Sequence, residues 1–224
     1  MNFFTTLECS ECGRTFSKEK VQTYCKNCNS PIFAKYNLEK AKHNLTKNDL
    51  TSREPNMWKY EEILPVNREE NVVSLGEGMT PVHQLDGLSN RLGVEKLFVK
   101  DDGVIPTGSF KARGLAMAVS KAKELGIDRL AIPSAGNAAG ALSTYGARAG
   151  LEVVAIMPED APDACIVESR MAGARVYLVD GVISDAGKIV QEGKDKYGWF
   201  DVSTTKEPYR KKEKKTMGLE LAEQ

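Results

Sequence analysis

The chain has 224 residues, of which 41% are hydrophobic and 28% are charged, a composition typical of a soluble globular protein. Thirty-one basic residues balance thirty-one acidic ones, so the overall charge favours neither nucleic acid nor a membrane surface as a partner. No apolar run reaches the roughly 20 residues of a membrane-spanning helix, and the first residues lack the pattern of a signal peptide. These features predict a cytoplasmic protein.

Four of the five cysteines form two C-x2-C pairs near the start of the chain: Cys9 with Cys12, and Cys25 with Cys28. Each pair can aim two thiolates at one point, and two pairs complete the tetrahedral site that Zn²⁺ prefers. In a reducing compartment this spacing favours a metal site over disulfides, with a redox pair as the alternative. Residues 1–36 are therefore expected to form a zinc ribbon around a structural Zn²⁺. Cys165 stands alone and is expected to contribute only to packing.

Residues 37–70 are expected to form a linker with helical segments. The first half is polar and basic and predicts a short helix followed by a linker. The stretch NMWKYEEILPV then predicts an amphipathic helix that packs through Trp58, Ile63 and Leu64.

From residue 71 to residue 224, strand-like and helical segments alternate. The strand-like segments are KLFVK (96–100), RLAIP (129–133), EVVAIMP (152–158), ARVYLVD (174–180) and GWFDVS (198–203). Gly126 and Gly150 end two of the predicted helices, Ser184 opens another, and the last residues predict the first turns of one more. This alternation predicts an α/β fold with a parallel twisted sheet and flanking helices. Ligands of such sheets bind beyond the carboxyl ends of the strands, where PTGSFK and PSAGNAAG are both expected.

Lys111 follows the turn-forming run PTGS and Phe110 at the start of a predicted helix. A nucleotide phosphate loop would need the lysine directly after Gly108, and no G-x-G-x-x-G occurs, so neither nucleotide motif is supported. A helix N-terminus and burial both lower the proton affinity of an amine. Lys111 is therefore predicted to be a nucleophile toward an aldehyde, with Phe110 shielding the bond from water. A solvated lysine at a helix start is the alternative.

The second loop, PSAGNAAG, is expected to open a helix whose first N–H groups can receive an anion. Within it, Asn137 supplies an amide that can hydrogen-bond an aromatic hydroxyl. A simple helix cap is the alternative role for Asn137.

Four segments together resemble threonine synthase: LGEGMTP, GVIPTGSFKARG, PSAGNAAG and KEPYR…KKTMG. The ribbon and MWKYEEILPV are similar to the long-N-terminus branch of that family. The resemblance implies a fold-type-II enzyme, similar to tryptophan synthase β, that uses pyridoxal 5′-phosphate (PLP) to convert O-phospho-L-homoserine and water into L-threonine and phosphate. It implies that Lys111 carries the cofactor and then transfers protons, that Asn137 holds the 3′-oxygen of the ring, and that Ser134 contacts the substrate.

A phosphorylated substrate needs cationic and hydroxyl groups, and the segment STTKEPYRKK offers both. Arg210 can bind a phosphate through two donors, while Thr204 and Thr205 can donate hydroxyls. In the family the corresponding segment lines the substrate-phosphate pocket. A solvated basic run is the alternative.

The chain departs from the family pattern at Ile105, where asparagine is usual, and at Lys212 and Glu213, where Glu-Gly is frequent. The family continues well past Gln224, where it holds the cofactor phosphate and the pyridine nitrogen. The resemblance therefore implies that residues 71–224 are a truncated catalytic region with weak cofactor retention and little turnover on their own.

Other functions stay open. Cysteate synthase resembles threonine synthase but uses O-phosphoserine and sulfite, and another fold-type-II PLP lyase is a further alternative, because related enzymes share the same motifs. A non-catalytic zinc-ribbon protein with a degenerate PLP fold is the alternative of another class. The sequence leaves the oligomeric state open, with a homodimer as the candidate.

Overall fold

The computed structural model describes residues 2–211 and 214–224, so the predictions made on Lys212 and Glu213 lie outside the described residues. Among the described residues, a four-stranded parallel sheet has the order β8-β7-β6-β9. Its strands are β6 (Arg129–Pro133), β7 (Glu152–Pro158), β8 (Arg175–Val179) and β9 (Phe200–Asp201). The central strand β7 is an almost continuous apolar run, because a parallel strand is covered on both faces. The predicted parallel sheet is confirmed.

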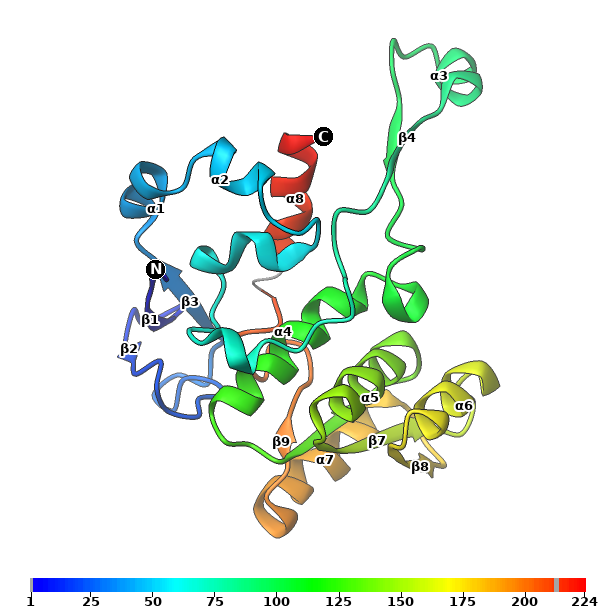
Figure 1. Cartoon of the computed structure of the whole chain (residues 1–224). Helices are drawn as coiled ribbons and strands as arrows, with labels where there is room; N and C mark the ends of the chain where they lie inside the picture. Colours follow the sequence, from blue (N-terminus) through cyan, green and yellow to red (C-terminus); the bar gives the residue numbers. More distant parts are fainter. Residues whose placement is uncertain (1, 212–213) are drawn as a thin grey trace.

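Helices cover both faces of this sheet (Figure 1): α4 (Lys111–Glu124), α5 (Asn137–Ala149), α6 (Asp163–Met171) and α7 (Ile183–Tyr197). On one face, Val154 and Ile156 pack with Ala186 and Val190 of α7. The alternate strand residues pack on the other face in the cluster that contains α4 and α5. The pattern follows from the two-residue period of side chains along a strand.

Helix boundaries follow the sequence closely. As predicted, α4 ends just before Gly126 and α5 before Gly150, and both glycines adopt the left-handed conformation, with φ of 70° and 69°. The helix expected to open at Ser184 begins one residue earlier. The final predicted helix is present as α8 (Lys214–Glu223).

The segment KLFVK does not join the parallel sheet. It forms β5 (Phe98–Lys100), which pairs antiparallel with β4 (Val82–Gln84), and the two strands flank α3 (Asp86–Leu92). This unit extends away from the rest of the molecule (Figure 1). Phe98 and Val99 are 53% and 43% exposed, so the strand lacks the two buried faces of a central parallel strand. The expectation that PTGSFK follows a strand of the parallel sheet is wrong.

The N-terminal residues form an antiparallel sheet of order β2-β1-β3, from β1 (Phe4–Cys9), β2 (Thr15–Phe16) and β3 (Ile32–Tyr36). Two short helices follow where one was expected, α1 (Leu38–Asn44) and α2 (Lys47–Thr51).

The stretch NMWKYEEILPV forms the 3₁₀ helix η1 (Met57–Ile63), and a second 3₁₀ turn, η2 (Glu69–Asn71), follows it. Trp58, Ile63 and Leu64 are buried as predicted. The segment is 3₁₀-helical where an ordinary amphipathic helix was expected, and its backbone is kinked at Tyr60.

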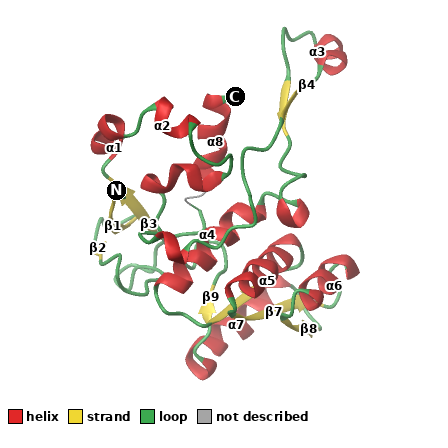
Figure 2. Ribbon diagram, in the orientation of Figure 1, coloured by secondary structure: helices red, strands yellow, loops and turns green. Residues whose placement is uncertain are grey.

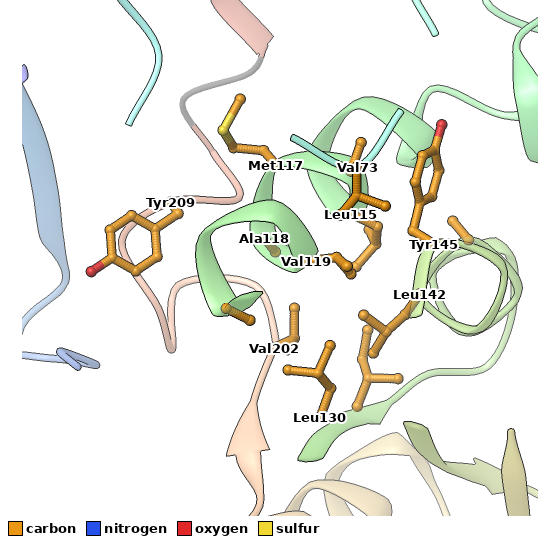
Figure 3. Packing of buried hydrophobic residues seen from close by; sticks show 14 of the residues in the cluster. Val73, Leu115, Met117, Ala118, Val119, Leu130, Leu142, Tyr145, Val202 and Tyr209 are labelled. Atoms are coloured by element: carbon orange, nitrogen blue, oxygen red, sulfur yellow. The ribbon is translucent and has the colours of Figure 1, made fainter. Parts of the chain in front are cut away.

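Helix α4 lies at the centre of the core. Every residue from Ala112 to Ala122 is buried. Figure 3 shows Val119 close to Leu130 and Leu142, with Tyr209 on another side of the helix. The same cluster includes apolar residues of the N-terminal sheet, so the ribbon and the α/β region share one core.

Figure 2 shows the short strands separated by helices and loops. None of the helices in the described parts of the chain combines the length and the apolar character needed to span a bilayer.

Candidate active site and cysteine cluster

Lys111 is the first residue of α4, and the turn before it is tight. The 3₁₀ turn η3 (Pro106–Gly108) has positive φ at Thr107 and Gly108, 67° and 61°. The Ser109 hydroxyl then accepts a hydrogen bond from the backbone N–H of Lys111 at 3.3 Å, and the Ser109 carbonyl accepts one from Ala112 at 3.0 Å. The run PTGSFK therefore fixes where α4 begins and so where Lys111 lies.

Lys111 lines a cavity of about 70 Å³ together with residues that lie about a hundred positions later in the sequence. The described lining residues are Lys111, Gly114, Thr204, Arg210, Lys211 and Lys214. Three residues predicted for the site thus meet in one place. Thr205, also predicted, is not among the described lining residues; its backbone has a φ of 72° and its hydroxyl donates to the Thr204 carbonyl.

Two lining residues, Lys211 and Lys214, were missed by the sequence reasoning. They belong to the basic run for which a solvated surface was the alternative interpretation. No local sequence signal marks Lys214. In the structure the ring of Phe110 lies 4.0 Å from Lys111 Nζ and 4.1 Å from Lys214 Nζ. Both distances are within the range of a cation–π contact. Phe110, which is 38% exposed, therefore contacts both amines at the cavity.

Arg210 is almost fully buried in a turn that is closed by a carboxylate. The Glu207 side chain accepts hydrogen bonds from the backbone N–H groups of Tyr209 and Arg210, at 2.6 and 2.9 Å. The Arg210 guanidinium donates to the Val202 carbonyl at 2.7 Å. A guanidinium has five N–H donors, so this bond can orient the group while the same group binds other partners.

The second predicted loop begins α5. The Ser134 hydroxyl accepts hydrogen bonds from the backbone N–H groups of Gly136 and Ala139, both at 3.2 Å, and donates to the Gly136 carbonyl. Ser134 thus organises the start of the helix. Asn137 is exposed, and its Oδ1 lies 3.9 Å from the thiol of Cys165. Cys165 is half-buried and packs against the main core.

Neither Ser134 nor Asn137 is among the described residues that line the Lys111 cavity. Nevertheless η3 packs against α5, so the two loops are neighbours. The buried hydroxyl of Thr107 in η3 has no hydrogen-bond partner among the described residues. An amine, an amide, helix N–H groups and an orphaned hydroxyl suit a cofactor that carries an aldehyde, an aromatic hydroxyl and an anion.

The loop SLGEGMTP is held by a fully buried carboxylate that the sequence reasoning did not single out. Glu77 accepts hydrogen bonds from Trp58 Nε1 and from the Tyr145 hydroxyl, both at 2.7 Å, and from the backbone N–H of Leu75 at 2.8 Å. The carboxylate thereby joins this loop to η1 and α5. Burial, followed by the charge of Glu77, raises the pKa of Tyr145 well above its ordinary range, so the phenol stays a donor.

Four cysteine thiols gather at the ribbon as predicted. The sulfur atoms of Cys9, Cys12, Cys25 and Cys28 all lie within 4.8 Å of one another. Zn–S bonds of about 2.3 Å in a tetrahedron place sulfur atoms about 3.8 Å apart, which this cluster matches. Hydrogen bonds with Ser30, then with Cys9, lower the pKa of the Cys28 thiol to about 6, whereas burial raises that of Cys9 to about 11. The donor set fits a structural Zn²⁺ site.

The fold and the site define an α/β protein with a lysine amine at the start of one helix, beside the loop that begins a second helix. A family model described as "Pyridoxal-phosphate dependent enzyme" matches residues 73–224, and the chain belongs to this family of PLP-dependent enzymes.

Two curated relatives are threonine synthases. The chain is 36% identical to that of Methanosarcina acetivorans over 97% of its own length, and 34% identical to that of Methanocaldococcus jannaschii over 96%. In each case it spans 53% of the relative, so it covers about half the length of these proteins.

Solved structures of PLP-dependent enzymes share the fold. Diaminopropionate ammonia lyase of Escherichia coli superimposes with a TM-score of 0.61 at 22% identity, over 67% of this chain and 44% of that one. Maize serine racemase superimposes with a TM-score of 0.60 at 22% identity, over 65% and 44%. At this identity the likeness concerns the fold alone, and it confirms the predicted fold class.

Proposed function

We propose that the protein containing this chain is a threonine synthase, which converts O-phospho-L-homoserine and water into L-threonine and phosphate. The observation that carries the proposal is the cavity that joins Lys111 to Arg210 and Thr204. The identity to two threonine synthases over nearly the whole chain supports it independently.

The residues of the chain have distinct roles in this proposal. Lys111 binds the cofactor through its amine and afterwards moves protons at the α and β carbons of the substrate. The Asn137 amide donates to the 3′-oxygen of the ring, Phe110 limits the access of water, and Ser134 contacts the substrate. When bound, PLP supplies the electron sink for the reaction.

The basic side of the cavity binds the substrate phosphate. Arg210 offers a planar pair of donors, and Thr204 offers a hydroxyl at the cavity. Thr205 joins them once its hydroxyl turns away from the Thr204 carbonyl. A phosphate monoester carries nearly two negative charges at neutral pH, so it gains most from a cavity lined by several cations.

The remaining parts have structural roles. Residues 1–36 form a ribbon that holds Zn²⁺ through the four clustered cysteines, residues 37–70 form the linker, and residues 71–224 belong to the PLP-binding region. We place the protein in the cytoplasm, with a homodimer as the candidate assembly.

The cofactor site is tested by reductive labelling of the protein at the length of its curated relatives, because this chain covers about half of them. PLP is added, the mixture is reduced with borohydride, and the modified lysine is identified by peptide mapping. We expect the pyridoxyl group on Lys111, its loss in Lys111→Arg, and wild-type labelling in Lys123→Arg, an exposed position on the same helix. Labelling spread over surface lysines would remove the catalytic proposal and favour a non-catalytic ribbon protein.

The substrate is tested by product analysis on the protein at the length of its curated relatives. Threonine formed from O-phospho-L-homoserine supports the proposal. Cysteate formed from O-phosphoserine and sulfite, without threonine synthesis, would assign the chain to cysteate synthase instead.

A further inference from the structure

Aromatic side chains of the ribbon face the part of the chain that carries Arg210. They are Tyr24, Phe33 and Tyr36. In the same order they contact Lys206, Lys211 and Lys215, with distances from Nζ to the ring centroid of 5.5, 6.0 and 3.6 Å. These are cation–π distances. The outer surface of residues 203–211, named here the anion loop, therefore lies against the ribbon.

A buried lysine joins the same elements from inside. Lys121 of α4 is fully buried and pairs with Glu124. Its Nζ lies 5.5 Å from the ring of Phe4 in β1 and 5.6 Å from the ring of Tyr209 in the anion loop. Tyr209 is 1% exposed and directly precedes Arg210. One ammonium group thus lies between the ribbon, the anion loop and the helix that begins with Lys111.

The bonds inside the anion loop and the contacts that the loop makes with other elements determine different things. The bonds from Glu207 and to Val202 define the shape of the turn at Arg210. The contacts with the ribbon and with Lys121 define where that turn lies relative to α4. The width of the cavity between Arg210 and Lys111 therefore depends on the contacts of the anion loop with the ribbon and with Lys121.

We propose that the ribbon positions the anion loop, so that Tyr24 and Phe33 on the outside and Phe4 with Lys121 on the inside keep Arg210 at the cavity beside Lys111. These are positioning residues, because they act through Arg210. The inference rests on the proposed function only for the identity of the anion. It gives the N-terminal module a part in substrate binding beyond its own folding.

The loop can be tested without cofactor or substrate, because it is rich in trypsin sites. Limited digestion of the 224-residue chain is followed after Lys206, Arg210 and Lys211. We expect the double variant Tyr24→Leu/Phe33→Leu to be cut about fivefold faster or more, the combined effect of two exposed cation–π contacts. Tyr24→Phe/Phe33→Tyr keeps both rings and should be cut at the wild-type rate.

Tyr177→Leu is the matched control, since Tyr177 is a 53% exposed aromatic residue on β8. It should leave cleavage in the anion loop unchanged. A merely structural role of the rings would lower the thermal midpoint without a selective increase of cleavage in the loop, and that result would overturn the inference. Equal cleavage of the leucine variant and the wild type would overturn it as well.

Repeating the digestion with added inorganic phosphate tests this inference and the proposed anion site separately. Phosphate should slow cleavage of the wild-type loop, and the leucine variant should need a severalfold higher concentration for the same protection. If phosphate fails to protect the wild type while the leucine variant is still cut faster, the anion site of the proposed function is wrong and the positioning by the ribbon stands. If phosphate protects both equally, the positioning is wrong and the anion site stands.

Discussion

Arg113 and Glu220 form a fully buried ion pair, in which Nη2 of the arginine donates to Oε2 of the glutamate at 2.8 Å. The arginine also donates to both oxygens of Asp102 at 3.0 Å. Burial disfavours the charged guanidinium, but the two carboxylates outweigh it and raise the pKa of Arg113 above its ordinary value. Because Arg113 lies two residues after Lys111, this pair ties the first turn of α4 to α8.

Removing the arginine should destabilise the protein strongly. Arg113→Met leaves the carboxylates of Glu220 and Asp102 with less compensation, and breaking a buried pair costs about 3–5 kcal/mol. Lys100, which bonds Glu220 at 2.9 Å, retains part of the compensation. The free energy of unfolding from urea titration measures the loss. Arg148→Met, on the exposed end of α5, should change it by less than about 0.5 kcal/mol. A loss below about 1 kcal/mol in Arg113→Met would contradict the network.

The same carboxylates make stability depend on pH in the acid range. Burial raises the pKa of Glu220 and of Asp102, but hydrogen bonds from Arg113 outweigh it and hold both pKa values below their ordinary values of 4.5 and 3.8. The folded state then binds fewer protons than the unfolded state, so acid favours unfolding. The stabilisation is complete above about pH 5 and is lost as the pH falls through the folded-state pKa values.

Urea titrations between about pH 3 and pH 7 measure this dependence. Glu220→Gln should be less stable at neutral pH and should lose less stability on acidification than the wild type. Glu192→Gln, on the exposed side of α7, should keep the wild-type slope. If the free energy of unfolding of Glu220→Gln falls as steeply with acidification as that of the wild type, other carboxylates cause the pH dependence.

The sequence predicted the elements of the α/β region well because their patterns are local. The apolar run of β7 and the glycines after α4 and α5 mark their elements without reference to other segments. The segment KLFVK was misplaced because periodicity reports the faces of a strand and not its partner. Its antiparallel pairing with β4 joins strands on either side of α3, and the local sequence pattern of a strand does not identify such a partner.

Only some of the site residues were predicted, because the others are recognised by contacts with distant segments and not by a local pattern. The meeting of Lys111, Thr204 and Arg210 was anticipated through the family resemblance. Lys214 was missed because a lysine run has the same composition on a solvated surface as in a cavity wall. Glu77 and Arg113 were missed as buried charges because each has a partner far away in the sequence: Tyr145 lies 68 positions from Glu77, and Glu220 lies 107 positions from Arg113.

A glycine in the loop SLGEGMTP should be irreplaceable. Gly78 has a φ of +118°, and a Cβ added there would lie 2.3 Å from the backbone nitrogen of Met57. That nitrogen donates to the Glu77 carbonyl at 2.7 Å, so it cannot move away without loss of the bond. Gly78→Ala should therefore lower the free energy of unfolding by about 2 kcal/mol or more.

The matched control lies in a helix. At Gly187 of α7, an added Cβ would meet none of the described residues of other elements within 4 Å, and the backbone is not left-handed. Gly187→Ala should therefore stabilise the protein by about 0.5–1 kcal/mol. Opposite signs for the two substitutions are the expected result of urea titration. A neutral Gly78→Ala would show that the loop is free to shift away from η1.

Removal of the proposed Zn²⁺ should destabilise more than the ribbon. Structural zinc contributes about 10–16 kcal/mol of folding energy in small isolated modules. Here Cys25 lies in the same buried cluster as Leu115 of α4, so opening the ribbon also exposes the core beside Lys111. A chelator should lower the thermal midpoint of the whole chain, and native mass spectrometry should record the loss of one zinc ion.

Cysteine variants distinguish the loss of a metal ligand from the loss of a thiol elsewhere in the protein. Cys28→Ser should lower the thermal midpoint and abolish zinc binding, because it removes one of the four clustered ligands. Cys165→Ser should retain the zinc, since Cys165 lies near Asn137 and outside the cluster. If the protein purified under reducing conditions contains no zinc and its midpoint does not respond to a chelator, the cluster holds no structural metal, and the ribbon must be stabilised by the core that it shares with α4.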